Sequence, residues 1–336
     1  MAEQKVTGVK VLGIGMHVPD IIATNEDFTK IVDTSDEWIT QRTGIKERHI
    51  TDGEPTYYLG AQAAKKALDD AGIKAEDIGL IIATTVTADY YTPSLSCLIQ
   101  REIGATGSMA IDVNCACSGF VYGFDMAKRY LQTDDELKYV LLVAAEELSK
   151  FVDYTDRSSC VLFGDGAAAF VLEKRENTVY SGFLCADGNG AEYLAARGLK
   201  AENAFRKNPE EFDMGMPQTK EYFLYQNGKE VYKFAVKALP EAVEKACGKM
   251  GIEPKELDAI VPHQANMRII ETAAKNLDVA LDKFPMYIDR YGNTSSASIP
   301  IAFCEAVKDG KIKRGDKVCL VGFGGGLTYG AAIFEY

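Results

Sequence analysis

Cys117 is the strongest candidate for a nucleophile in this chain of 336 residues. It comes after an apolar segment, residues 110–114, that predicts a strand, and just before residues 118–132, which predict a helix. A thiol in the first turn of a helix lies near the positive end of the helix dipole, so we expect a lowered pKa for this thiol. Cys115 competes for the role two residues further from the helix, and either side chain also suits a small buried apolar position.

His263 is the histidine best placed to meet a ligand. It comes directly after the apolar segment Ala259–Pro262, and ligands of α/β proteins gather beyond the carboxyl ends of strands. The other two histidines, His17 before a proline turn and His49 in a charged segment, are interpreted as structural or solvated. Asn293 lies in a glycine-containing turn and, taken alone, also suits a turn residue or a helix cap.

Phe323 and the three glycines that follow it come directly after the last predicted strand. Glycines let backbone N–H groups approach a ligand closely, which fits either a phosphate cradle or an oxyanion hole. A dinucleotide fingerprint beginning at Gly13 fails, because Val18 stands where its third glycine is needed. Cysteine and histidine do not recur with metal-ligand spacing, so we expect no metal site.

An internal repeat of about half the chain must position these residues. Gly72–Ile82 recurs as Gly251–Val261, 179 residues later, and Tyr139–Val143 recurs as Lys317–Val321, 178 residues later. We therefore expect two related halves, residues 1–174 and 175–336. In the repeat, Cys117 corresponds to Ser295 and His263 to Thr84, so the turn of Asn293 is the second copy of the turn of Cys117.

Short apolar segments alternate with amphipathic ones in both halves. Helices are predicted at 56–71, 118–132, 228–250 and 296–308, and strands at 80–84, 140–144, 259–262 and 318–322. Nearly continuous apolar strands indicate sheets covered on both faces, so two such halves predict a five-layer α/β/α/β/α sandwich. Residues 187–227 fit neither template, and either a cover over a site or a solvated loop remains open.

The composition is that of a globular protein, with 47% hydrophobic and 26% charged residues. Such apolar content excludes disorder as the main state. The net charge of −12 disfavours nucleic acid as a partner, unless a local basic patch overrides it. We expect no membrane span, because no apolar run reaches roughly 18 residues. Eight cysteines, mostly in apolar segments, suit free thiols and a cytoplasmic location.

Six segments, spread over nearly the whole chain, resemble β-ketoacyl-acyl-carrier-protein synthase III, a thiolase-like condensing enzyme family. They are Ser35–Ile39 with Arg42–Ile45, Ala116–Phe120, Leu162–Ala167, Pro262–Asn266, Gly292–Ser295 and Phe323–Gly326. A cysteine, histidine and asparagine set distinguishes this branch from thiolases and from elongating synthases, in which the asparagine is replaced. The resemblance implies the thiolase-like five-layer α/β/α/β/α fold.

The resemblance also implies a reaction. Cys117 would take an acyl group from acyl-CoA, and the backbone N–H groups of Cys117 and Gly325 would stabilise the oxyanion. His263 and Asn293 would bind the thioester oxygen of malonyl-acyl-carrier protein as carbon dioxide leaves, with Phe323 favouring its expulsion. The product is 3-oxoacyl-acyl-carrier protein, and acyl-CoA is a substrate, so no cofactor is implied.

Two alternatives remain beside this reaction. One is a specialised ketosynthase or acyltransferase of secondary metabolism that uses the same three side chains. The other, of a different class, is a non-catalytic acyl-binding subunit, and the intact set of Cys117, His263 and Asn293 disfavours it.

Further residues are carried over from the family by position. Trp38, the only tryptophan, and Arg157 would stack on the two faces of the CoA adenine, while the other CoA contacts would be Thr34, Arg42 and Asn266. The docking patch for the acidic carrier protein maps to Lys233, Arg268 and Lys275. Asn276 departs there from a lysine pair seen in some members.

A homodimer is also expected from the resemblance. Residues 88–93 resemble the loop that reaches into the acyl pocket of the partner subunit. Thr92 stands at a gating position that is phenylalanine in acetyl-preferring members, so we expect a pocket that admits longer acyl chains.

Overall fold

Two mixed sheets form the frame of the protein. The computed structural model describes residues 7–176, 178–199, 204–205, 215–217 and 223–336. The first sheet has the strand order β1 (Thr7–His17), β7 (Gly166–Glu176), β6 (Tyr139–Glu146), β4 (Leu80–Thr84) and β5 (Met109–Val113). The second has the order β8 (Tyr180–Ala186), β13 (Thr328–Glu335), β12 (Lys317–Gly324) and β11 (Ala259–Pro262).

The second sheet repeats four strands of the first in order and direction. In the first sheet β1 and β7 pair antiparallel, as do β7 and β6, while β6 and β4 pair parallel. In the second sheet, β8 and β13 pair antiparallel, as do β13 and β12, while β12 and β11 pair parallel. Only β5, at the edge beside β4, has no counterpart among the described strands.

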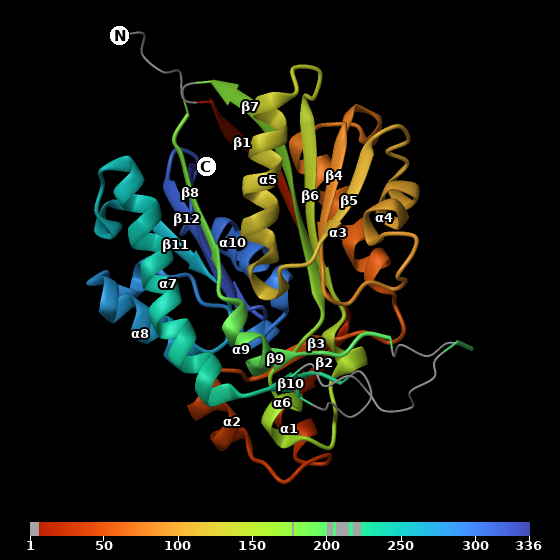
Figure 1. Ribbon diagram of the computed structural model, residues 1–336, viewed down its shortest axis with the longest axis vertical. Coiled ribbons are helices and arrows are strands. Elements are labelled where there is room, and N and C mark those ends of the chain that lie inside the picture. Colours follow the sequence, from red (N-terminus) through yellow and green to blue (C-terminus); the bar gives the residue numbers. More distant parts are fainter. Residues whose placement is uncertain (1–6, 177, 200–203, 206–214, 218–222) are drawn as a thin grey trace.

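Helices cover both sheets, as Figure 1 shows. Helices α3 (Thr56–Ala71) and α4 (Leu95–Ile103) pack on the outer face of the first sheet, and α7 (Gly228–Met250) and α8 (Met267–Leu277) on that of the second. Between the sheets lie α5 (Gly119–Thr133) and α10 (Ser298–Lys308), whose apolar side chains join both sheets in one core. The predicted five-layer sandwich is therefore confirmed.

Smaller elements close the end of the sandwich where the site lies. They are β2 (Ile21–Thr24), β3 (Glu47–Ile50), α1 (Asn25–Phe28), α2 (Asp36–Thr43), α6 (Arg157–Cys160), α9 (Ile288–Tyr291), β9 (Leu194–Ala195) and β10 (Tyr225–Gln226). Short 3-10 turns occur at Ala75–Asp77, Leu148–Phe151, Gly188–Tyr193, Pro254–Glu256 and Leu281–Lys283. Fully buried Arg48 links this region, donating to the Asn25 side chain and to the carbonyls of Ala23 and Val161.

The structure corrects the register of the repeat by one residue. Two 3-10 turns, η2 (Ala116–Ser118) and η7 (Ser295–Ala297), precede α5 and α10. Each turn begins with a residue at positive φ, +45° at Ala116 and +50° at Ser295. Cys117 therefore corresponds to Ser296, and the predicted match with Ser295 is wrong. The offset of 178, taken from the strands, does not hold at the turns, because the chain between helix and strand is one residue shorter in the second half.

The boundary between the halves stays a prediction, although β7 ends in the first sheet at Glu176 and β8 begins in the second at Tyr180. Among the described residues, no helix has the length and apolar character needed to cross a membrane.

Candidate active site

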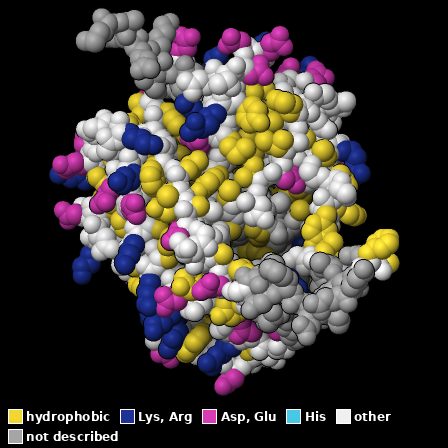
Figure 2. All heavy atoms as spheres, in the orientation of Figure 1, with side chains coloured by type: hydrophobic (Ala, Val, Ile, Leu, Met, Phe, Trp, Pro, Cys, Tyr) yellow, Lys and Arg dark blue, Asp and Glu magenta, His cyan; other side chains and the backbone are white. Residues whose placement is uncertain are grey.

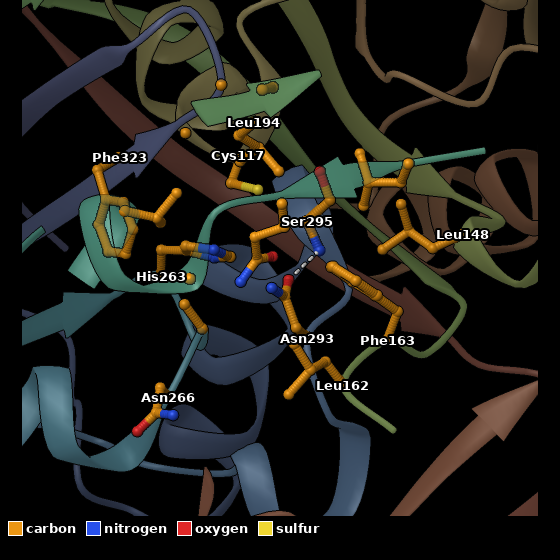
Figure 3. Close-up of a pocket in the computed structure, with 18 of the residues that line it drawn as sticks. Cys117, Leu148, Leu162, Phe163, Leu194, His263, Asn266, Asn293, Ser295 and Phe323 are labelled. Carbon is orange, nitrogen blue, oxygen red and sulfur yellow. Dashed lines mark hydrogen bonds between the residues drawn. The ribbon is translucent and has the colours of Figure 1, made fainter. Parts of the chain in front are cut away.

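A cavity of about 1020 Å³ lies where the two halves meet. Cys117, His263 and Asn293 all line it, although they come from η2, from the end of β11 and from the turn before η7. Figure 3 shows their side chains directed toward a common space. Of the other predicted site residues, the cavity is also lined by Trp38, Arg42, Asn266, Arg268, Phe323 and Gly325.

Cys117 lies in the second position of η2, against the end of β12. The contact is so close that a Cβ atom on Gly324 would be 2.5 Å from the backbone nitrogen of Cys117, so only glycine fits there. The thiol side chain belongs to the buried core, with 8% of the residue exposed. Burial raises the pKa of Cys117 to about 12, and the charge of Glu146 adds to this, while the hydroxyl of Ser295 acts in the opposite direction.

The expected lowering of the Cys117 pKa by the helix dipole is therefore wrong for the free protein. A thiolate in this dry position loses its hydration, and that loss outweighs the favourable field of one helix end.

His263 continues the pairing of β11 with β12, because its backbone N–H donates to the carbonyl of Val321 at 2.8 Å. Its Nδ1 lies 2.6 Å from the hydroxyl of Ser298, which also accepts from the backbone N–H of Gln264. The Ser298 proton is then available for Nδ1, which favours the tautomer with the ring proton on Nε2. Burial lowers the pKa of His263 to about 3, so the ring is neutral. Phe323 packs against it edge-on, with ring centroids 5.3 Å apart.

Asn293 is held through its backbone and through one side-chain oxygen. Its N–H donates to the carbonyl of Leu162 at 2.9 Å, and its carbonyl accepts from Gly164 at 3.1 Å. Its Oδ1 accepts from the backbone N–H of Ser295 at 2.9 Å, the bond drawn dashed in Figure 3. The Nδ2 group of Asn293 is therefore left as a donor beside the cavity.

The mouth of the cavity carries the cationic and aromatic residues expected to meet a nucleotide. Guanidinium groups of Arg42 and Arg157 lie 4.8 and 5.0 Å from the ring centroid of Trp38. Asn266 caps α8 and donates to the carbonyl of Arg42, which ties α8 to α2. Arg268 makes a second tie by donating to the carbonyl of Gln41 at 2.7 Å. On the face in Figure 2, lysine and arginine side chains lie over α7, α8 and α2 with acidic ones among them.

Five predicted site residues do not line the cavity: Thr34, Thr92, Arg157, Lys233 and Lys275. Arg157 reaches it only through Trp38, and the hydroxyl of Thr34 is buried without a hydrogen-bond partner. Lys233 and Lys275 are exposed on α7 and α8, and Lys233 pairs with Glu230 at 2.7 Å. Thr92 is exposed in the loop before α4.

Asn276, which stands where some family members have lysine, has a structural role on α8. Its Nδ2 donates to the carbonyl of Val236 at 3.2 Å, and this bond holds α8 to α7.

The structure adds residues that the sequence did not single out. Ala191, Leu194, Leu224 and Gln226 line the cavity, so the described part of residues 187–227 forms a cover and not only a solvated loop. Ser295 and Ser298 were also missed, although serines in the otherwise apolar segment that leads into α10 were a usable signal.

Comparisons with known proteins agree with this geometry. Residues 111–188 match the family model of 3-oxoacyl-[acyl-carrier-protein (ACP)] synthase III, and residues 247–336 match its C-terminal model. The chain is 46% identical over 329 residues to β-ketoacyl-[acyl-carrier-protein] synthase III of Clostridium acetobutylicum, covering 98% of each chain.

Solved structures are similar over the same length. The crystal structure of 3-oxoacyl-[acyl-carrier-protein] synthase III from Aquifex aeolicus is 42% identical, with a TM-score of 0.89 over 98% of this chain and 100% of that one. A priming β-ketosynthase of a polyketide pathway is 31% identical, with a TM-score of 0.87 over 98% of this chain and 96% of that one. The protein described here belongs to the β-ketoacyl-[acyl-carrier-protein] synthase III family of acyl-transferring condensing enzymes.

Proposed function

We propose that this enzyme condenses an acyl-CoA primer with malonyl-acyl-carrier protein, with loss of carbon dioxide, to start fatty-acid synthesis. The observation that carries the proposal is the meeting of Cys117, His263 and Asn293 in one cavity, from turns far apart in the chain. A specialised ketosynthase of secondary metabolism is the second candidate. It has less support, because the polyketide relative is 31% identical and the C. acetobutylicum synthase 46%.

In the first step, the sulfur of Cys117 attacks the thioester carbonyl of acyl-CoA. The carbon–sulfur bond to CoA breaks, and CoA leaves as a thiol that takes up the proton from Cys117. The negative charge on the tetrahedral intermediate is stabilised by the backbone N–H groups of Cys117 and Gly325. The close approach of Gly324 and Gly325 to η2 supports this assignment, since the two glycines leave room for the substrate oxygen.

In the second step, malonyl-acyl-carrier protein loses carbon dioxide. The electron pair of the broken carbon–carbon bond moves onto the thioester oxygen as an enolate, which accepts hydrogen bonds from Nε2 of His263 and Nδ2 of Asn293. The enolate carbon then attacks the acyl carbonyl, the carbon–sulfur bond to Cys117 breaks, and the sulfur leaves as a thiolate that takes up a proton from solvent to restore the thiol. The neutral Nε2–H tautomer and the fixed Oδ1 of Asn293 support these roles, and Phe323 keeps the departing carboxylate in an apolar surrounding.

For CoA, we assign the adenine to Trp38 and Arg157, and the rest of the nucleotide to Thr34 and Arg42. The 5.0 Å separation of Trp38 and Arg157 leaves no room for a base, so the Arg157 side chain must move aside when CoA binds. Asn266 would then line the pantetheine channel below.

For the carrier protein, we assign docking to Lys233, Arg268 and Lys275, on neighbouring faces of α7 and α8. Their exposure beside the cavity mouth supports this assignment, because docking there aims the pantetheine arm inward. A cytoplasmic location is supported by the eight cysteines, which are all free thiols.

Mass spectrometry tests the leading function. After incubation with acetyl-CoA we expect an acetyl adduct on Cys117 in the wild type and no adduct in Cys117→Ala. Cys115 also lines the cavity, but Cys117 is the thiol that lies within η2, against the end of β12. Cys97→Ala, which changes an exposed thiol, is the control and is expected to acylate normally. Absence of any adduct on the wild type would favour the acyl-binding subunit over the enzyme.

A survey of primers tests the acyl gate. With threonine at position 92 in place of a phenylalanine, we expect octanoyl-CoA to serve as a primer beside acetyl-CoA, measured with malonyl-acyl-carrier protein as acceptor. Thr92→Phe is expected to reject octanoyl-CoA and to keep acetyl-CoA. Strong exclusion of octanoyl-CoA by the wild type would end this assignment.

A further inference from the structure

Glu146 is a buried carboxylate beside the cavity that has no role in the proposed reaction. It is the last residue of β6 and has 0% of its surface exposed. Among the described residues, every group that donates a hydrogen bond to it is neutral. Its Oε2 accepts from the backbone N–H of Val86 at 3.0 Å and from the hydroxyls of Thr85 and Thr87 at 3.1 and 2.7 Å. Its Oε1 accepts from the backbone N–H and hydroxyl of Ser296 at 3.3 and 2.7 Å.

The repeat relates this carboxylate to the active site. The offset of 178 between β6 and β12 makes Glu146 the counterpart of Gly324, just as Ser296 is the counterpart of Cys117. Beside η2, Gly324 has no side chain that could meet the backbone N–H of Cys117. Beside η7, the corresponding N–H, on Ser296, donates to Glu146. The carboxylate thus occupies, beside η7, the position that glycine leaves open beside η2.

Glu146 reaches Asn293 through two bonds along η7. Ser296 is anchored by Glu146, and the neighbouring residue Ser295 donates its backbone N–H to Oδ1 of Asn293 at 2.9 Å. Ser295 is held at a positive φ of +50°, a conformation that a serine keeps only when its surroundings impose it. The two bonds that Ser296 donates to Glu146 supply that restraint on the turn.

We propose that Glu146 is a positioning residue that joins the loop after β4 to η7 and thereby aims the Asn293 amide into the cavity. The inference rests on the proposed function, in which Asn293 stabilises the enolate. It assigns Glu146 to the decarboxylation step and leaves acylation of Cys117 largely independent of it.

Glutamine cannot replace this glutamate, although it has the same shape. Each carboxylate oxygen accepts one backbone N–H, from Val86 on one side and from Ser296 on the other. Hydroxyl partners can turn and become acceptors, but a backbone N–H cannot. Whichever way the amide is turned, its NH₂ group faces a backbone N–H, and one of the two bonds is lost.

The test measures the two steps separately in wild type, Glu146→Gln, Asn293→Ala and the double variant. Acylation is followed as acetyl transfer from acetyl-CoA to Cys117, and decarboxylation as carbon dioxide released from malonyl-acyl-carrier protein. We expect Glu146→Gln to slow decarboxylation by about tenfold or more and acylation by less than about threefold. In the Asn293→Ala background, the same change should add almost nothing, because both act through one amide. The proposal would be overturned if Glu146→Gln slowed both steps equally. It would also be overturned if Glu146→Gln slowed decarboxylation as much in the Asn293→Ala background as it does in the wild type.

Two further variants separate positioning from general damage. Asp125→Asn changes another buried carboxylate, bonded to Tyr180 and Arg129 and outside the cavity, and is expected to leave both steps unchanged. Ser296→Ala removes the hydroxyl donor to Glu146, which also contacts the carbonyl of Thr84, and keeps the backbone N–H donor, so it is expected to give the same pattern at smaller size. It replaces Glu146→Gln in the comparison if that variant does not fold, and an equal loss in both steps would then overturn the proposal.

A crystal structure of Glu146→Gln would give the position of the Asn293 side chain directly, and this result does not depend on what Asn293 does in the reaction. An amide turned away from the N–H of Ser295, with Cys117 unmoved, supports the inference, and an unmoved amide overturns it. If Asn293→Ala decarboxylates at the wild-type rate, the proposed function of Asn293 fails, and this structure still decides the role of Glu146.

Discussion

Cys117 and His263 are both uncharged in the free protein, for the same physical reason. Burial raises the pKa of the thiol to about 12 and lowers that of the imidazole to about 3. For two groups buried this deeply, a neutral thiol and a neutral ring have lower free energy than a thiolate and an imidazolium. The ring is therefore suited to donate from Nε2 and not to act as a cation.

We predict that the rate of decarboxylation does not change through ionisation of His263 between pH 5 and pH 8. With a pKa near 3, the imidazole keeps its Nε2 proton as the only ring proton over this whole range. The measurement is the rate of carbon dioxide release at saturating malonyl-acyl-carrier protein. A decline with a midpoint near 6.5 would show instead that the ring is hydrated and titrates freely.

The same group affects stability in a defined direction. Between about pH 3 and 6.5, the unfolded chain holds a proton on His263 that the folded chain does not. The contribution of His263 to the free energy of unfolding therefore falls as the pH is lowered below 6.5.

At this scale, the sequence was sufficient to predict which three residues meet but not how they are tuned. Cys117 and His263 stand out because a helix start and a strand end are visible in the pattern of apolar residues. The sequence indicated the wrong direction for the shift of the thiol pKa. The helix dipole can be inferred from a predicted helix, but the burial of the thiol depends on how the other half packs against it. Ser298 and Glu146 were missed because their partners lie on segments distant in sequence.

The end of β12 is the element on which the nucleophile depends most closely. We predict that Gly324→Ala slows acylation of Cys117 by tenfold or more and lowers the free energy of unfolding by about 1–3 kcal/mol. The added Cβ would meet the backbone of Cys117, which cannot rotate away as a side chain can. Acetyl transfer and chemical denaturation give the two measurements.

Gly248→Ala is the control for this element, because a Cβ there meets nothing within 4 Å and the residue lies inside α7. It is expected to acylate normally and to be slightly more stable, as alanine favours helix over glycine. Normal acylation by Gly324→Ala would refute the close fit between β12 and η2.

Regular elements followed from the sequence more closely than turns did. The helices at 56–71 and 228–250 and the strands at 80–84 and 259–262 have their predicted bounds, because apolar periodicity and flanking glycines mark them. Helices α5 and α10 begin one and two residues later than predicted, since their first residues form 3-10 turns. Those turns depend on positive φ at Ala116 and Ser295, which no local preference of these residues suggests.

At the scale of the whole molecule, the edge of the first sheet is an exposed, partly apolar surface. Among the described strands, β5 pairs only with β4, and Met109 at its start is 45% exposed. In the loop before α4, Tyr90 and Tyr91 are 59% and 78% exposed. An apolar edge strand beside exposed aromatic rings is a surface that associates readily.

We predict that the protein sediments as a dimer joined through this edge. Met109→Arg places a charge in the expected interface and should shift the protein toward monomer in analytical ultracentrifugation. Leu281→Arg is the matched control, because Leu281 is similarly exposed, at 40%, but lies beside the second sheet. A wild type that stays monomeric at micromolar concentration would contradict the prediction.

The division of the reactive groups between the two halves also has a consequence for synthesis of the protein. Asn293 is added 176 residues after Cys117, which is roughly 9 to 35 s later at ordinary elongation rates. During that interval a ribosome-bound polypeptide carries the thiol without the amide, and without the glycines of β12. Under the proposed mechanism, such a chain lacks the Gly325 donor and the Asn293 amide, so we expect catalytic competence only after the second half has folded onto the first.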